Sequence, residues 1–342
     1  MTRNKSAAFA RALAVFALVL GLLAPATASA QTKLKVAYIP IMPMAQLFVM
    51  EGEGWTKEAG IELELTKFSS GPAIVQAIAS GGFDVMYFGI GPAMVSRANG
   101  VPIKVVASNV IEQIALITRG EFDEIMATAA SPAEGVRTFT EKTGRKPRIA
   151  SLPKGSVPDT VFRHWLIRVA GLQESDIDIL GMGAGKVQQA MLAKSVDAAS
   201  ILEPIVTIIT DRVPDARIVA KGGEMLENQP GAVLAVREGL ITDNSAAVAK
   251  LVELHNRATL LINNEPDRAA VHVHAFLGQG LIPLETIQRA MRSSISNFVA
   301  DPRKIVPATK VMHDFSAEIG TLKKPVPLDE LFDSSFYEQA TK

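Results

Sequence analysis

Four glycine-containing turns are the residues of this sequence best suited to chemistry. They read Ser69-Ser70-Gly71-Pro72, Gly89-Ile90-Gly91-Pro92, Pro153-Lys154-Gly155-Ser156 and Gly181-Met182-Gly183-Ala184-Gly185. Each follows a β-rich run and precedes a helical pattern. Glycine lets a ligand approach the backbone, and a helix start carries unpaired N–H groups and roughly half a positive charge. The turns therefore predict a site for an anion or a strong acceptor oxygen.

The segments that position the first two turns alternate between strands and helices. Strands are expected at 34–39, 61–67, 84–88 and 103–108, and helices at 44–58, 72–80 and 92–99. Strands that alternate with helical patterns favour right-handed βαβ units around a parallel sheet that is covered on both faces. In such a sheet, ligands bind beyond the carboxyl ends of the strands, which is where these turns lie.

An internal repeat extends this pattern to the second pair of turns. A shift of 113 residues places 35–40 on 148–153, 74–84 on 187–197 and 104–107 on 217–220. Four similar segments, counting Ala59–Ile61 against Ala170–Leu172 with a two-residue slip, keep one order. The sequence therefore predicts two copies of one α/β unit.

We expect an α/β fold of two Rossmann-like lobes around a cleft. Lobe 1 comprises 31–117 and 233–342, lobe 2 comprises 118–232, and the chain crosses between them near 110–119 and 230–236. An apolar run at 232–237 follows the second copy. Helical patterns at 245–263, 268–276, 284–298 and 308–319 are expected to pack on lobe 1. Two lobes joined by crossings form a cleft that can hinge.

The amino-terminal residues have the features of a secretory signal peptide. Arg3, Lys5 and Arg11 precede an apolar stretch, and cleavage is expected after Ala30 in Ala28-Ser29-Ala30. The whole chain of 342 residues has 35 basic and 35 acidic side chains, and cleavage would leave 32 and 35, a net charge of −3. This balance gives no reason to expect a nucleic-acid partner. We expect a periplasmic protein.

Several kinds of chemistry are excluded by residues that the sequence lacks. With no cysteine there is no disulfide, thiol nucleophile or lipidated cysteine. The run 180–187 mimics a phosphate-binding loop but has Leu180 and Val187 at positions that need Gly and Ser or Thr. His272 and His274 have no third ligand nearby, so no metal is expected. No catalytic motif is present, and we predict neither an enzyme nor a cofactor.

The ordered motifs resemble a known family. They are Phe68–Val85, Gly89–Ala93, Pro153–Ser156, Ser195–Ala198 and Glu203-Pro204. They are similar to those of the solute-binding proteins of nitrate, sulfonate and taurine ABC importers, the NMT1/THI5-like superfamily, which also includes binders of thiamine-pyrimidine precursors. The resemblance covers about residues 33–240. It implies the type II periplasmic-binding fold, a small ligand in the cleft and an ABC permease in the inner membrane as partner.

The resemblance also implies which residues contact the ligand. They are the loop Pro40–Met44, Ser69, Ser70, Gly71, Gly91, Asn109, Ser156 and the region of Glu203. The sequence departs from the family pattern at Gly183-Ala184-Gly185-Lys186 and at Leu202-Glu203-Pro204, and 119–147 is longer than usual.

Local chemistry refines this candidate site. Ile41, Met42 and Met44 form a flexible apolar lining that suits an organic body better than a bare nitrate ion. Gly183 belongs to the fourth turn, and Lys186 at the following helix start is a candidate for pairing with an acidic group, although a solvated lysine is the alternative. Glu203 either accepts from an amine or hydroxyl or caps a neighbouring turn.

The predicted function is capture of a small organic molecule, sulfonate- or carboxylate-like, by a monomer that delivers it to a permease. A ligand touching both lobes favours their closed arrangement. Three alternatives remain open at this point: a periplasmic receptor subunit that senses a ligand, a binder of a pyrimidine or thiamine precursor, and, least favoured, a periplasmic enzyme.

Overall fold

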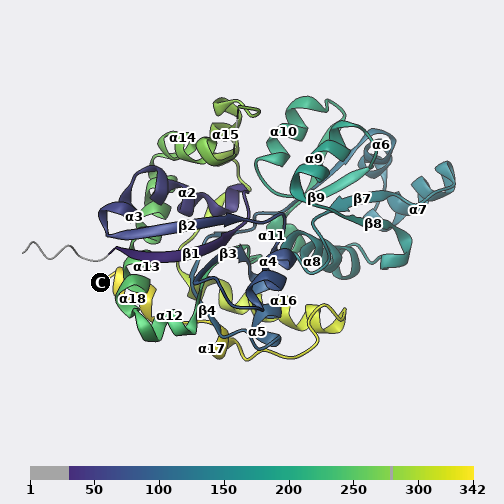
Figure 1. Ribbon diagram of the computed structural model, residues 1–342. Coiled ribbons are helices and arrows are strands. Elements are labelled where there is room, and N and C mark those ends of the chain that lie inside the picture. The colour runs from purple at the N-terminus through teal and green to yellow at the C-terminus, as the bar shows by residue number, and fades with distance from the viewer. Residues whose placement is uncertain (1–30, 278–279) are drawn as a thin grey trace, which may run out of the picture. The chain divides into compact units, whose positions relative to one another are not determined.

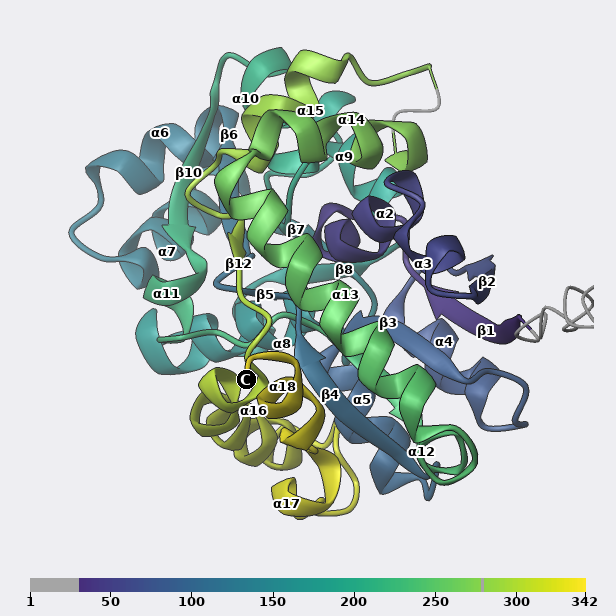
Figure 2. The same cartoon turned by 90° about the vertical axis from the view of Figure 1, so that its left-hand side faces the viewer.

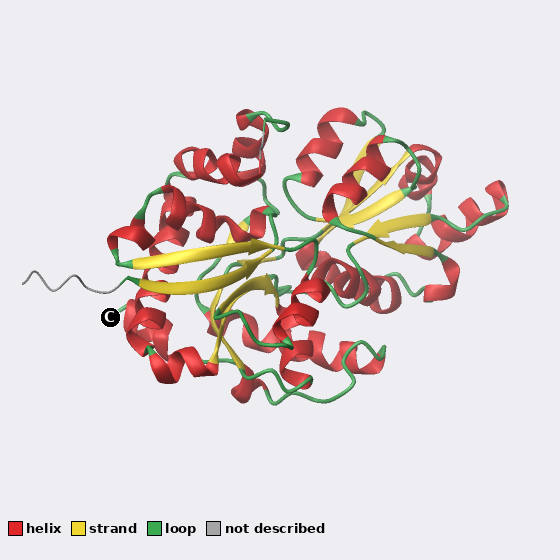
Figure 3. Cartoon of the chain, viewed as in Figure 1, coloured by secondary structure: helices red, strands yellow, loops and turns green. Residues whose placement is uncertain are grey.

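The structure is a computed structural model that describes residues 31–277 and 280–342. Two five-stranded sheets, yellow in Figure 3, carry helices on their faces. The predicted signal peptide lies outside the described residues. Within the described ranges, no helix combines the length and apolarity needed to cross a membrane.

The first sheet has the strand order β2-β1-β3-β11-β4. Its strands are β1 (Thr32–Tyr38), β2 (Ile61–Lys67), β3 (Val85–Gly89), β4 (Ile103–Ser108) and β11 (Ala232–Arg237). Strand β1 pairs in parallel with β2 and β3. The central strands are buried, as their apolar runs predict, whereas the edge strand β2 is half-buried or exposed after its first residue, Ile61. We call this sheet and its helices lobe 1.

The second sheet has the order β10-β6-β9-β7-β8 and forms lobe 2. Its strands are β6 (Ala115–Arg119), β7 (Arg148–Ser151), β8 (Asp178–Gly181), β9 (Ala198–Ile201) and β10 (Ala216–Lys221). Starting from β8, the order and directions repeat those of lobe 1, with β7, β8, β9 and β10 in the places of β1, β2, β3 and β4. The predicted repeat is therefore confirmed.

The prediction that the sheets are parallel is wrong for one strand of each. Strand β11 is antiparallel to both of its neighbours, β3 and β4, and β6 is antiparallel to β9 and β10. Each of these strands enters its sheet immediately after the chain has crossed from the other lobe. At the crossings, β5 (Val110–Ile111) pairs with β12 (Asn297–Phe298), and Ile111 bridges Pro230.

The helices of lobe 1 cover both faces of its sheet. They are η1 (Met42–Met44), α2 (Ala45–Gly52), α3 (Trp55–Glu58), α4 (Gly71–Ile78), α5 (Ile90–Ala98), α12 (Glu238–Asp243), α13 (Ser245–Asn264) and α14 (Pro266–Leu277). Helix α2 packs against α13 and α14, while α4 packs against α5 (Figure 1). The single helix predicted at 44–58 is interrupted, because Gly54 has a left-handed φ of 75°.

Lobe 2 follows the same plan with additional helices. They are α6 (Gly120–Thr128), α7 (Pro132–Thr143), α8 (Val157–His164), the π-helical turn η2 (Trp165–Val169), η3 (Glu174–Asp176), α9 (Ala184–Leu192), α10 (Ile205–Arg212) and α11 (Gly222–Met225). Helices α6 and α7, which pack together, account for the long segment at 119–147.

The carboxyl-terminal segment contacts both lobes, whereas the sequence predicted that it packs on lobe 1. It contains α15 (Leu284–Met291), η4 (Pro302–Ile305), α16 (Val306–Glu318), α17 (Leu328–Leu331) and α18 (Ser335–Ala340). Helix α15 contacts α14 and α10, α16 contacts α5 and α8, and α18 packs beside α13 (Figure 2). The helix predicted at 284–298 is too long, because α15 ends at Met291 and β12 follows.

Candidate functional site: the seam between the lobes

The predicted glycine turns of the two lobes face each other. A Cβ atom placed on Gly89 would lie 2.7 Å from Val157 Cγ2, and one on Gly91 would lie 3.2 Å from the carbonyl oxygen of Gly155. A Cβ atom placed on Gly183 would lie 3.8 Å from the carbonyl oxygen of Ser69. Residues from opposite lobes are thus in close contact where the strands end. We call this contact region the seam.

Three helices begin at the seam. Ser70 caps α4 by accepting from the Ala73 N–H at 3.4 Å, and Ser156 caps α8 by accepting from the Asp159 N–H at 3.5 Å. Helix α5 begins at Ile90, whose N–H donates to the carbonyl oxygen of Gly231. Among the described residues, the N–H groups of Gly71, Gly91 and Val157 have no hydrogen-bond partner. Helix starts from both lobes therefore offer free donors to one place.

A small cavity lies among these helix starts. Its volume is ≈ 20 Å³, about the space of one water molecule. It is lined by Ile39, Ile41, Met44, Gly71, Gly89, Pro92, Gln113, Leu152, Ser156, Val157, Pro158, Leu202 and Ala232. The lining comes from both lobes, and four of the predicted site residues, Ile41, Met44, Gly71 and Ser156, are in it. The expected cleft is shut here, so an organic ligand needs the lobes to separate.

A second cavity, of ≈ 10 Å³, is lined by two further predicted residues, Met42 and Glu203. Pro43, Val110, Gln113, Ile295, Ser296 and Phe298 complete its lining. Glu203 accepts from the backbone N–H and the hydroxyl of Thr207, both at 3.0 Å, and so caps α10. Burial raises the pKa of this carboxyl group. Glu203 thus has the capping role that the sequence left open, and it also lines a cavity.

The remaining predicted residues lie outside both linings. Asn109 is fully buried and donates from Nδ2 to the carbonyl oxygen of Pro43 at 2.9 Å, so it holds the loop that carries Met42 and Met44. Ser69, Ser70, Gly91 and Gly183 lie at the seam through the contacts described above. Lys186 is exposed, and the structure does not bring it to either cavity. Ligand contact by any of these residues stays a prediction.

Sequence reasoning missed Gln113, which lines both cavities. It lies between β5 and β6, in the segment where the chain first crosses between the lobes. Its side chain is only 3% exposed. The one available signal was a lone amide within the apolar run that follows Glu112, in a segment already predicted to be a crossing.

A buried ion pair lies directly behind the seam. Asp159, in the first turn of α8, accepts from the Gly155 N–H at 3.0 Å and from Arg163 Nε at 2.9 Å. Burial raises the pKa of Asp159, while the Arg163 charge opposes that shift. A carboxylate in this position offsets the positive end of α8. The start of α8 is therefore less favourable to an anion than its backbone alone suggests.

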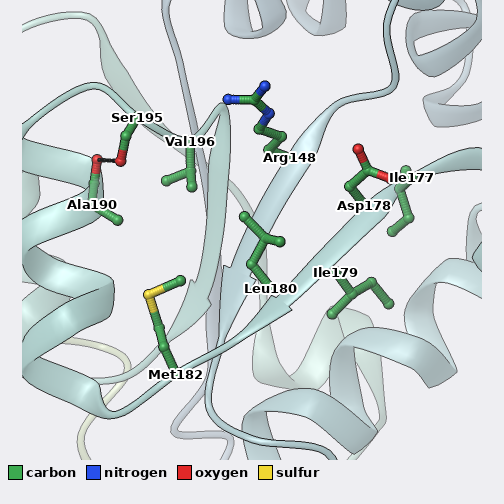
Figure 4. Close-up of a pocket in the computed structure, with 9 residues that line it drawn as sticks. All are labelled: Arg148, Ile177, Asp178, Ile179, Leu180, Met182, Ala190, Ser195 and Val196. Atoms are coloured by element: carbon green, nitrogen blue, oxygen red, sulfur yellow. Dashed lines mark hydrogen bonds between the residues drawn. The ribbon is translucent and has the colours of Figure 1, made fainter.

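A larger hollow of ≈ 520 Å³ lies on lobe 2 alone, among β7, β8 and α9 (Figure 4). Met182 and Val196 line it. The repeat places Phe68 and Phe83 at the corresponding positions of lobe 1, where the two rings meet edge to face at 5.7 Å. The hollow thus arises where lobe 2 has smaller side chains. Because all its walls belong to one lobe, closure of the lobes does not reshape it, and we favour the seam as the site.

Two lobes of this strand order, each completed by an antiparallel strand from the returning chain, define the type II periplasmic-binding fold. The sequence matches the NMT1-like family over residues 27–275, and the chain belongs to that family. The resemblance found in the motifs is thereby confirmed.

Other known proteins are similar to this chain over most of its length. A provisionally named binding protein of Brucella abortus is 24% identical over 298 residues, which are 83% of this chain and 84% of the relative. The periplasmic nitrate-binding protein of Synechocystis superposes with a TM-score of 0.76 at 14% identity, over 91% of this chain and 88% of its own. The alkanesulfonate-binding protein of Xanthomonas axonopodis, bound to MOPS, superposes with a TM-score of 0.70 at 18% identity. The superposition covers 90% of this chain and 100% of the other. At these identities the superpositions establish the fold.

Proposed function

We propose that this protein is the solute-binding component of an ABC importer, which captures a small organic molecule between its lobes and delivers it to a membrane permease. The observation that carries the proposal is the convergence of helix starts from both lobes, with free N–H donors, on one cavity. The family and the periplasmic neighbours of the same fold support it. The predicted signal peptide would place the protein in the periplasm.

Capture rather than catalysis is supported by the polar groups at the seam. The hydroxyl of Ser156 serves as a helix cap. Among the described residues it has no hydrogen bond to an imidazole, and His164, at the other end of α8, is bonded to the carbonyl oxygen of Met225 at 2.9 Å. A serine nucleophile needs a base within hydrogen-bonding reach. The seam supplies binding groups without that arrangement.

A thermal-shift panel tests the proposed function. It should contain taurine, alkyl and aryl sulfonates, nitrate, bicarbonate, carboxylates, amides and pyrimidines. At a concentration one hundred times Kd, a ligand that binds only the folded protein stabilises it by about 2.7 kcal/mol, which raises Tm by several degrees. If neither this panel nor the small molecules of a periplasmic extract shift Tm, the binding function is wrong. Ligand-dependent co-purification with a permease checks the transport partner.

A further inference from the structure

Gln113 lies where the two crossings between the lobes meet. Its side chain lies against Gly231, which belongs to the second crossing. A Cβ atom on Gly231 would lie 2.8 Å from Gln113 Oε1 and 2.5 Å from the carbonyl oxygen of Val110. Any larger residue at 231 would therefore displace the Gln113 amide or the neighbouring strand. The two crossings together hold this one polar side chain between the lobes.

The Gln113 amide is nevertheless unused within the protein. Its Oε1 atom is buried and has no hydrogen-bond partner. Among the described residues, its Nε2 atom also donates to no acceptor, whereas Gln46 nearby donates to the carbonyl oxygen of Asn109 at 2.7 Å. Burying an unpaired polar group is unfavourable, and a leucine of similar size would avoid that cost. The amide oxygens of Gln46, Asn109 and Gln229 are also buried and unpaired, but of these four residues only Gln113 lines the two cavities. Its amide is therefore the one that a partner from outside can reach.

The groups around Gln113 show which chemistry such a partner needs. Both cavities are lined by Gln113, and their other polar groups are Ser156, Glu203, Ser296 and the helix starts at Gly71 and Val157. Neither lining contains a lysine or arginine. The one formally charged side chain is Glu203, whose charge is negative. Ile41, Met44 and Leu152 supply apolar surface for the body of a ligand.

These groups suit an uncharged ligand better than an oxyanion. A sulfonate, carboxylate or nitrate carries acceptor oxygens only, so it leaves Gln113 Oε1 unpaired, and in the second cavity its oxygens meet those of the Glu203 carboxyl group. A carboxamide, a lactam or an aminated ring has an acceptor beside an N–H donor. The acceptor of such a ligand can accept a hydrogen bond from the free N–H of Gly71 or Val157, and its N–H can donate to Gln113 Oε1. The unpaired Gln113 Oε1 and one of the free N–H groups then both have partners.

We propose that Gln113 is the specificity-determining residue of the seam, and that the seam selects an uncharged organic molecule with an amide-like edge over an oxyanion of the same shape. This inference rests on the proposed binding function and revises the acidic ligand expected from the sequence.

Matched pairs of probes test the selection. The pairs are acetamide and acetate, benzamide and benzoate, nicotinamide and nicotinate, and benzenesulfonamide and benzenesulfonate, titrated calorimetrically into the purified protein. The uncharged member should bind at least about tenfold more tightly, since one buried hydrogen bond and one avoided charge conflict are at stake. Gln113→Leu should weaken the uncharged members by about tenfold or more and the anions by less than about threefold. The exposed Gln189→Leu is the matched control and should change neither.

Each other outcome overturns the proposal in a distinguishable way. Tighter binding of the anions refutes the ligand class and leaves the importer function standing. An unchanged preference in Gln113→Leu refutes the role of Gln113. If none of the eight probes binds, the selection rule is wrong, and the importer function is then decided by the wider panel and the periplasmic extract.

The stability of the unliganded variant gives a second readout. Because the Gln113 amide has no partner in the protein, Gln113→Leu should leave Tm unchanged or raise it. A lower Tm would show that Gln113 supports the fold instead, and the proposal would fail even if binding also changed.

Discussion

His255 is the buried residue whose chemistry the structure defines most fully. Its Nε2 atom donates to the carbonyl oxygen of Ser108 at 2.8 Å, and its Nδ1 atom accepts from the Tyr87 hydroxyl at 3.2 Å. This pairing fixes a neutral tautomer with both nitrogens used. Burial lowers the pKa of His255 to about 4. The imidazole therefore links β4, β3 and α13 in the core of lobe 1 only while it is uncharged.

This pKa predicts a loss of stability in mild acid. In the unfolded chain His255 is protonated with a pKa near 6.5, whereas in the folded protein it is protonated only near pH 4. Between these values the unfolded state holds more protons, so the contribution of His255 to the free energy of unfolding is present above about pH 6.5 and is lost as the pH is lowered toward 4. The contribution of this one group is about 3 kcal/mol. Urea unfolding at several pH values measures it.

His255→Gln is the control, because glutamine does not titrate. The variant loses some stability at pH 7 with the altered hydrogen bonds, but its pH dependence should be flatter than that of the wild type across this range. Parallel curves for the two proteins would show that His255 is not the group that titrates.

Among the elements, α15 and the segment that joins it to β12 differ most from what the sequence predicts. The sequence predicts that helix 284–298 continues on lobe 1, yet the chain leaves α15 at Met291 and forms β12 against the crossing strand β5. Ile295, 2% exposed, is buried in the apolar cluster of lobe 2 with Ile201 and Ile205. Arg289 pairs with Asp211, and Lys221 Nζ donates to Ser294 Oγ at 3.0 Å. This segment therefore supports lobe 2.

Truncation of Ile295 tests that role. Ile295→Ala removes buried methyl groups from a packed cluster and should lower the free energy of unfolding by about 2–5 kcal/mol in urea titrations. Val311→Ala removes similar groups at a position that is 48% exposed, and it should change stability by less than about 0.5 kcal/mol. Equal effects in the two variants would mean that the segment is not anchored in lobe 2.

For the whole molecule, the question is what keeps the lobes together. Gly71 and Gly91 were predicted as equivalent members of the site, but in the structure their side-chain positions face different neighbours. A Cβ on Gly71 would lie 2.3 Å from Pro92 Cγ, which belongs to the same lobe. A Cβ on Gly91 meets the carbonyl oxygen of Gly155 across the seam. Gly91 therefore reports on closure more directly than Gly71, since the other contact of its Cβ, with Met312 Cε at 3.6 Å, is an ordinary van der Waals distance from a flexible side chain.

Gly91→Val should hold the lobes apart. Its methyl groups need space that the Gly155 carbonyl occupies, so the closed arrangement becomes a minor state. Small-angle scattering should show a larger radius of gyration than for the wild type. A ligand that enters between separated lobes then cannot be enclosed by groups of both lobes, so its affinity should fall on the order of tenfold or more.

Gly185→Val is the matched control for this experiment. A Cβ on Gly185 meets nothing within 4 Å, and the residue is exposed on α9. Its scattering profile and affinity should equal those of the wild type. If Gly91→Val gives the same profile as this control, contact at the seam does not determine closure.

The sequence by itself determined the local structure and its duplication. The limits of β2 and β4 were predicted to the residue, because apolar periodicity and turn residues act over a few positions. The apolar run noted at 232–237 coincides with β11, although its strand character was not predicted. The glycine turns were placed correctly at helix starts for the same reason. The shift of 113 residues correctly paired β1 with β7 and β3 with β9, since two copies of one pattern fold alike.

Only the tertiary structure decided which strands from distant parts of the chain become neighbours. The antiparallel places of β6 and β11, the burial of Ile295 in lobe 2 and the exposure of Lys186 depend on where the chain goes after it crosses. The same holds for Gln113. Its spacing resembles no motif, and its unpaired amide becomes significant only because two crossings, far apart in sequence, enclose it between the lobes.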